Sequence, residues 1–145
     1  MGRAVLWLVL VWLPVSLAAA EFSEPARGTQ TRQALMDAIR PHAEWNLGVP
    51  VEFVVDDLRV AGDIGYGELS PQRPGGAAID VYQTPMYRRG QADPEFQDGM
   101  YMHVLYRKSG ATWVAVHFSI GATDVWFSDP ELCREYRVVI PEFCR

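Results

Sequence analysis

The stretch from residue 98 to residue 127, DGMYMHVLYRKSGATWVAVHFSIGATDVWF, constrains the fold most because it is the longest strand-like region of the chain. Residues 100–107 and 112–119 are rich in β-branched and aromatic side chains, which favour strands. The segment between them, residues 108–111, contains Gly110 and is typical of a tight turn. This pattern predicts a central antiparallel hairpin, and we expect the rest of the chain to pack around it.

Two registers of this hairpin differ in the faces that they create. A two-residue turn at residues 109–110 places Leu105 opposite Val114, whereas a three-residue loop with Gly110 at a positive-φ position places Val104 opposite Val114. A slip of one residue moves a strand's side chains to the other face, so we prefer the second register, which gathers apolar side chains on one face. That core face carries Met100, Met102, Val104, Val114, Val116 and Phe118. The other face carries Tyr101, His103, Leu105, Trp113, Ala115 and His117.

An amphipathic helix is predicted over residues 31–48. Its apolar stripe recurs every four residues, at Leu35, Ile39, Ala43 and Leu47. Thr31 is the expected N-cap and Gly48 the expected end, while Pro41 predicts a kink within the helix. We expect this bent helix to pack on the sheet.

Further strands are predicted over residues 51–60, 64–70 and 77–83. The alternation of the first breaks at Asp56 and Asp57, which predicts a β-bulge there. Residues 84–97 form a polar loop that is long for a compact domain and is therefore a binding loop or a mobile one. A short helix is predicted at residues 130–136.

The order of these elements predicts an α+β fold. One kinked N-terminal helix packs on a curved antiparallel sheet of about four or five strands. This arrangement is similar to the cystatin-like and nuclear-transport-factor-like architectures, in which ligands often bind between the sheet and the helix. The cystatin inhibitor motif Gln-x-Val-x-Gly is absent from the sequence.

The N-terminus has the pattern of a signal peptide. Arg3 precedes an apolar run over residues 4–17, and three alanines at 18–20 supply a cleavage site. We therefore assign residues 1–20 to a signal peptide, 21–30 to a flexible N-terminus and 31–145 to a single α+β domain. The protein is expected to be periplasmic or secreted, with no stable membrane insertion after cleavage; an uncleaved anchor is the alternative.

Charge and cysteine content narrow the function. The net charge of −5 argues against a nucleic-acid partner. Cys133 and Cys144 are the only cysteines and predict a disulfide that ties down the C-terminal tail. Their segment holds no histidine and lacks a Cys-x-x-Cys spacing, so neither a metal nor a redox site is predicted there.

The candidate functional residues lie in and after the hairpin. His103 and His117 share a face, and Asp124 or Glu68 would have to complete a zinc site; half-exposed sheet histidines are the preferred interpretation. His117, Ser119 and Asp124 have the residue types of a hydrolase triad, but no nucleophile elbow surrounds the serine. The loop at 121–126 can hold an aromatic and a carboxylate at the lip of a pocket. The predicted ligand-binding residues are Tyr101, His103, Trp113, His117, Asp124 and Trp126, with no catalytic residue, metal or cofactor assigned.

Several motifs together resemble a functionally uncharacterised family of small exported bacterial proteins. They are VEFVVxxLRVxGD, PQRPGG, a WxV strand and IGATDVW, and the resemblance spans about residues 32–126. An aromatic residue commonly follows the Gly-Asp turn in that family, whereas Ile64 and Gly65 stand here. The resemblance implies a bacterial, periplasmic setting and brings no functional residues with it.

Three functions remain open at this point. The leading hypothesis is a non-enzymatic binding or envelope-accessory module whose partner is a small molecule or an envelope protein. It rests on the loop at residues 84–97 and on aromatic residues such as Tyr101 and Trp126, which are expected to be exposed. The alternative is a small hydrolase or isomerase with Asp124 or His103 as general base. A third is a structural subunit that pairs through an exposed edge strand.

Overall fold

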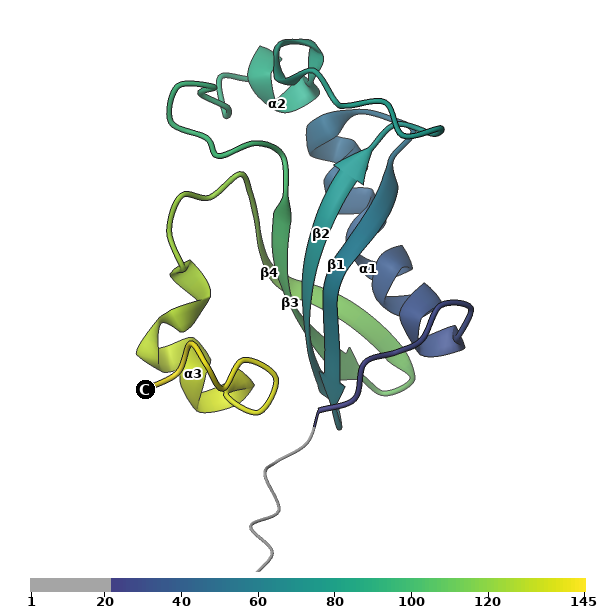
Figure 1. Cartoon of the computed structure of the whole chain (residues 1–145), viewed down its shortest axis with the longest axis vertical. Coiled ribbons are helices and arrows are strands. Elements are labelled where there is room, and N and C mark those ends of the chain that lie inside the picture. The colour runs from purple at the N-terminus through teal and green to yellow at the C-terminus, as the bar shows by residue number, and fades with distance from the viewer. Residues whose placement is uncertain (1–21) are drawn as a thin grey trace, which may run out of the picture.

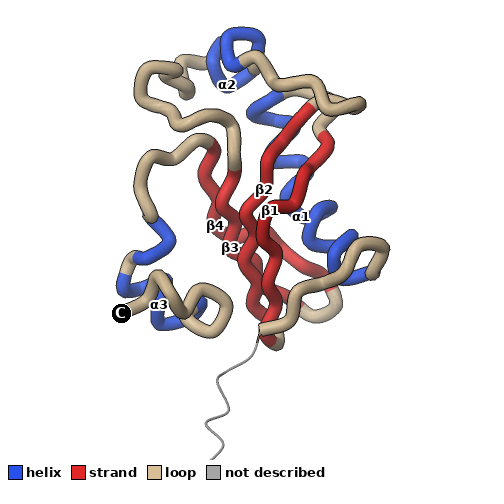
Figure 2. The backbone as a smooth tube through the Cα atoms, in the orientation of Figure 1, coloured by secondary structure: helices blue, strands red, loops and turns tan. Residues whose placement is uncertain are grey.

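A computed structural model describes residues 22–145 as three layers (Figure 1). Helix α1 (Gln30–Leu47) covers one face of a four-stranded sheet, and a C-terminal segment with helix α3 (Pro130–Tyr136) covers part of the other (Figure 2). The predicted signal peptide lies outside the described residues. Among residues 22–145, no helix is long and apolar enough to cross a membrane.

The sheet is an antiparallel meander in chain order. Its strands are β1 (Glu52–Ala61), β2 (Ile64–Gln72), β3 (Met102–Ser109) and β4 (Thr112–Ile120). The α+β class, with a helix packed on an antiparallel sheet, is therefore confirmed. The bulge in β1 is also confirmed, since the register shifts between Val55 and Asp57.

The prediction of a strand at residues 77–83 is wrong. These residues form a loop that ends in a 3₁₀ turn, η1 (Val81–Gln83). The carboxylate of Asp80 accepts a hydrogen bond from the Tyr82 amide at 3.0 Å, which caps the turn and competes with strand pairing. The alternating apolar pattern of this segment was too short to outweigh that local interaction.

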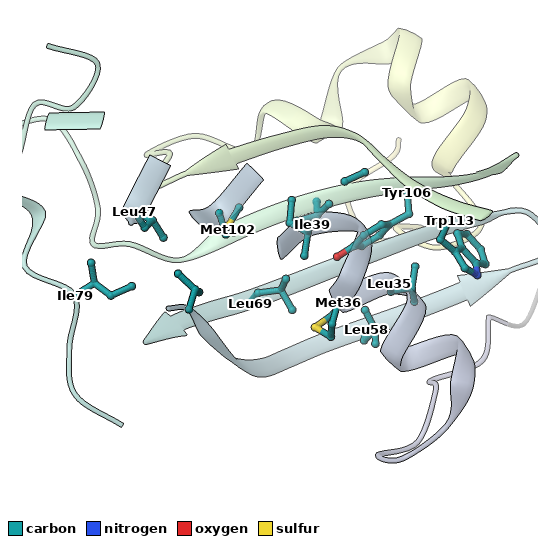
Figure 3. Packing of buried hydrophobic residues seen from close by; sticks show 14 of the residues in the cluster. Leu35, Met36, Ile39, Leu47, Leu58, Leu69, Ile79, Met102, Tyr106 and Trp113 are labelled. Atoms are coloured by element: carbon teal, nitrogen blue, oxygen red, sulfur yellow. The ribbon is translucent and has the colours of Figure 1, made fainter. Parts of the chain in front are cut away.

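Helix α1 follows the predicted apolar stripe. Its N-cap is Thr29, two residues before the predicted Thr31, and the Thr29 hydroxyl oxygen accepts a hydrogen bond from the Arg32 amide at 3.3 Å. Gly48, with φ of 82°, ends the helix as predicted, and Pro41 lies inside it. The stripe is buried against the sheet (Figure 3) at Leu35, Ile39, Ala43 and Leu47.

The register of the central hairpin differs from both predictions. The chain turns at residues 110–111, and Tyr106 consequently lies opposite Ala115. Beyond that pair the register shifts at a bulge in β4, so that Leu105 lies opposite His117. A bulge reverses which alternate residues face the core, and neither predicted register includes a bulge within residues 112–120.

This register buries Trp113 instead of its smaller neighbours. Trp113 and Ala115 face α1, whereas Val114 and Val116 are 42% and 43% exposed, contrary to prediction. Burial of an indole removes more apolar area from water than burial of a valine, which favours the observed turn. The other hairpin residues lie on their predicted faces: Met100, Met102, Val104 and Phe118 toward α1, and Tyr101, His103, Leu105 and His117 away from it.

The C-terminal segment builds a second core on the face opposite α1. It contains the 3₁₀ turn η2 (Trp126–Ser128) and α3, and both the predicted helix and the Cys133–Cys144 disulfide are confirmed. Arg59 of β1 fastens this segment by donating to the Val139 carbonyl at 3.1 Å and pairing with Glu142 at 2.6 Å. The buried members of this core are Tyr66, Leu105, Phe127, Cys133, Tyr136, Val139, Ile140 and Cys144.

Loss of the disulfide should destabilise the protein. It closes a loop of 11 residues, and in the chain-entropy account its removal lowers the free energy of unfolding by about 2–3 kcal/mol. We expect this loss in urea unfolding of the double variant Cys133→Ala/Cys144→Ala and of the reduced native chain. The reductant should leave the double variant unaffected. Equal stability of the native chain and the variant under oxidising conditions would contradict the structural role.

Candidate functional site

Three of the predicted ligand-binding residues, Tyr101, His103 and Trp126, lie together on the face of the sheet opposite α1, which we call the outer face. The rings of Tyr101 and His103 are 5.2 Å apart, and Phe127 lies 4.8 Å from His103 and 5.6 Å from Trp126. The remaining three lie outside this cluster. Trp113 is buried on the opposite face. His117 on β4 is exposed, and so is Asp124 in the loop at residues 121–126, which we call the exit loop.

The polar atoms of this cluster hold the exit loop on the sheet. The Tyr101 hydroxyl donates to the Ala122 carbonyl, and the indole nitrogen of Trp126 donates to Ser119 Oγ, both at 2.6 Å. His103 is half-buried, and its Nδ1 atom is buried without a hydrogen-bond partner among residues 22–145. Burial lowers the pKa of His103, which Glu68, facing it from β2, partly offsets.

The cluster is packed against the exit loop and does not form a pocket. Four depressions stand out on the surface of residues 22–145, and none of the four is lined by Tyr101, His103 or Asp124. Within the same residues, no group of three potential metal ligands comes together. Tyr101 and Trp126, which were expected to be exposed, are instead half-buried against their own loop.

A different group of aromatic side chains is exposed at the end of the molecule where α1 meets helix α2 (Pro85–Arg88) (Figure 1). Trp45 is 69% exposed and Tyr82 is 60% exposed. We call this region the aromatic–arginine surface. It consists of Trp45, Val49, Tyr82, Tyr87, Arg88 and Arg89.

Local sequence fixes how α2 presents these side chains. Thr84 is fully buried; its hydroxyl donates to the Val81 carbonyl at 2.6 Å and accepts from the Tyr87 amide at 3.2 Å. Pro85 follows at the first helical position, where its fixed φ suits a helix start. Met86 is buried in the main core and anchors the turn. Tyr87 and the residues after it are therefore held outward.

Two arginines attach this connection to the end of α1. The Arg73 guanidinium donates to the carbonyls of Leu47 at 2.7 Å and Pro50 at 3.0 Å, as well as to that of Gly48. Arg89 donates to the Trp45 carbonyl at 3.2 Å, and its guanidinium lies 5.0 Å from the centre of the Trp45 ring. Both satisfy carbonyls that a helix end leaves unpaired and complement its negative dipole.

Two grooves flank α2, and they differ in charge. The first, of about 520 Å³, is lined by Trp45, Val49 and three arginines at positions 73, 88 and 89, against a single acid, Glu44. The second, of about 330 Å³, is lined by Tyr82, Tyr87, Pro94 and two acids, Asp93 and Glu95. The two tyrosine rings are packed edge to face at 5.2 Å. One segment thus presents a basic groove and an acidic groove on either side of α2, and the tyrosine pair lines the acidic one.

A third groove, of about 640 Å³, lies along the C-terminal segment, and two of its four charged lining residues form ion pairs within residues 22–145. Among its lining residues, Arg134 pairs with Glu131, and Glu142 pairs with Arg59. The groove beside α2 is different, because none of its arginines forms an ion pair within residues 22–145.

The sequence did not predict the aromatic–arginine surface, but two of its features point to this region. The loop at residues 84–97, which contains Tyr87 and the two arginines after it, is predicted from the sequence to be a binding loop or a mobile one. Trp45 carried the clearest signal, since it lies off the apolar stripe of α1. A large aromatic on the polar side of a helix indicates a contact with something outside the helix.

No protein-family model, curated protein or solved structure matches this chain. The resemblance to a family of small exported bacterial proteins therefore stays a prediction.

Arg73 should matter for stability and Arg88 should not. We expect Arg73→Ala to lower the free energy of unfolding by about 2–3 kcal/mol, because three carbonyls at the end of α1 lose a charged donor. Arg88→Ala, which removes one exposed bond to the Gln83 carbonyl, should change it by less than about 0.5 kcal/mol. Urea unfolding of both variants measures the difference, and equal effects would refute the structural role of Arg73.

His103 should make stability fall in mild acid. Its pKa is lower in the folded chain than its ordinary value, so the unfolded chain binds the proton more readily. Stability should therefore be highest above a pH of about 6.5 and fall as the pH drops from there toward the folded-state pKa. In His103→Phe this component should disappear when urea midpoints are compared across that range. His117→Gln serves as the control because that imidazole is exposed, and a fall that persists in His103→Phe would contradict the assignment.

Proposed function

We propose that this protein is an exported, non-enzymatic binding module whose aromatic–arginine surface binds a protein partner in the cell envelope. The observation that carries the proposal is the exposure of Trp45, Tyr82 and Tyr87 beside arginines that form no ion pair within residues 22–145. Tryptophan, tyrosine and arginine supply most of the binding energy in protein interfaces, and exposed apolar patches commonly mark such sites. The shallow grooves on either side of α2 suit protein side chains better than an enclosed small molecule.

The filled main core supports binding at the surface. In the cystatin-like and nuclear-transport-factor-like architectures, to which we assign this fold as part of the proposal, a ligand cavity lies between helix and sheet. Here the Tyr106 ring fills part of that space against Gly67, where a Cβ would lie 3.2 Å from the ring (Figure 3). Leu35 and Ile39 of α1 pack on the same core with no exposed surface.

The same features disfavour the alternative of a cavity enzyme. A general base must reach the proton that it removes from a bound substrate. The His103 ring is packed among aromatic rings, and Asp124 lies exposed in a loop outside the four grooves. Neither group therefore occupies a pocket in which it could act on a substrate.

Export to the periplasm or outside the cell is part of the proposal. The disulfide supports it, because such bonds persist mainly in oxidising compartments. The apolar N-terminal run after Arg3 has the composition of a secretory signal. A bacterial envelope provides both conditions.

Position-specific photocrosslinking in the native cells tests this function. A benzoylphenylalanine at Tyr82 should give a discrete adduct with a protein of the periplasmic or secreted fraction, and the adduct should weaken at least about tenfold when Trp45→Ala is added, as expected for a hot-spot residue. The same probe at Val114, which is exposed on β4, should give none. Equal adducts at the two positions, or an adduct that tolerates Trp45→Ala, would show that this surface is not the binding site.

A further inference from the structure

The charges around α2 are separated by sign. Arg88 and Arg89 line the basic groove, whereas Asp93 and Glu95 line the acidic groove. All four side chains are exposed, and none forms an ion pair with another residue of the range 22–145. Arg88, Arg89 and Asp93 hydrogen-bond within the chain, but within residues 22–145 the charges of this segment are not neutralised by an opposite charge.

The positions of these charges are fixed by local structure. Arg88 belongs to the last turn of α2, which is capped by Thr84 and anchored by Met86. On the acidic side, the Asp93 carboxylate accepts a hydrogen bond from the Glu95 amide at 3.1 Å and holds that turn. The surface thus offers a fixed pattern of base, paired aromatic rings and acid.

A molecule that complements this pattern must present acid opposite the arginines and base opposite the carboxylates. A second copy related by a two-fold axis does so. In such an interface, residue i of the first copy contacts residue j of the second, and residue j of the first contacts residue i of the second. With the axis near α2, which contributes residues to both grooves, each basic groove would meet an acidic groove. Apolar rings would then lie at the centre and charges at the rim, as in known interfaces.

We propose that the partner at the aromatic–arginine surface is a second copy of this chain, in a symmetric dimer that pairs each basic groove with an acidic one. This inference rests on the proposed function of the surface and names its occupant. The net charge of −5 per chain opposes association in general. The interface therefore depends on local complementarity, and an excess of salt should weaken it.

Charge reversal with rescue tests this arrangement. Arg88→Glu and Glu95→Arg each place like charges across both halves of the interface, and we expect each variant to dissociate at least about tenfold more readily than the native chain, a penalty of about 1.4 kcal/mol or more. Mixing the two variants restores opposite charges in both halves, so the mixture should form a dimer. Sedimentation velocity over a concentration series measures all four samples.

Both substitutions are at exposed sites with few contacts. Within residues 22–145, the Arg88 side chain makes a single hydrogen bond, to the Gln83 carbonyl, and the Glu95 side chain makes none. Circular dichroism and thermal melting should show both variants folded. Arg134→Glu supplies the matched control, because it reverses an exposed charge on α3 and should leave the dimer intact.

The outcomes separate this inference from the proposed function. A native chain that stays monomeric while Tyr82 still crosslinks to a different envelope protein overturns the dimer and keeps the binding surface. A monomeric chain without that crosslink overturns both. A dimer that tolerates both reversals, or two folded variants that do not associate when mixed, shows that these charges are not in contact and overturns the inference.

Discussion

The need to cover two apolar faces of one small sheet determines most of this structure. Helix α1 covers one face, and the C-terminal segment covers the other through Phe127 and its neighbours. Arg59 is central to the second contact, because it pairs with Asp57 on its own strand and with Glu142 in the segment. Burial alone would lower the pKa of Arg59, but the two carboxylates raise it, so its charge is secure. The ring of Phe22 lies 4.6 Å from the same guanidinium and adds the N-terminal segment to this attachment.

This constraint explains why the expected site has a structural role. Tyr101, His103 and Trp126 lie where the exit loop joins the outer face, and their hydrogen bonds and ring contacts keep that loop in place. The binding site that we propose lies instead at the far end of the molecule, where the connection between β2 and β3 extends beyond the sheet. Arg73 and Thr84 order that connection internally, which leaves Trp45 and the side chains after Tyr87 free to meet a partner.

Several elements could be predicted because a local pattern specifies them. The stripe of α1 repeats every four residues, Gly48 ends the helix, and Asp56 and Asp57 interrupt β1 where the bulge occurs. The two cysteines, as the only pair, fixed the disulfide. The hairpin register could not be obtained in this way, because the bulge in β4 has no glycine or proline to mark it. The candidate site was equally hidden, since it joins the end of α1 to a loop distant in sequence and depends on tertiary contacts such as that of Arg89 with Trp45.

The central claim is that the chain meets a second copy of itself at the α2 end of the molecule. Amide ¹H–¹⁵N spectra recorded through a dilution series test it most directly, because each residue reports its own environment. The account predicts that the resonances of residues 45–49 and 82–96 shift together with concentration, while those of Tyr101, His103 and Trp126 stay fixed. Concentration-dependent shifts centred on β4 or on the outer face of the sheet, with none around α2, would contradict it.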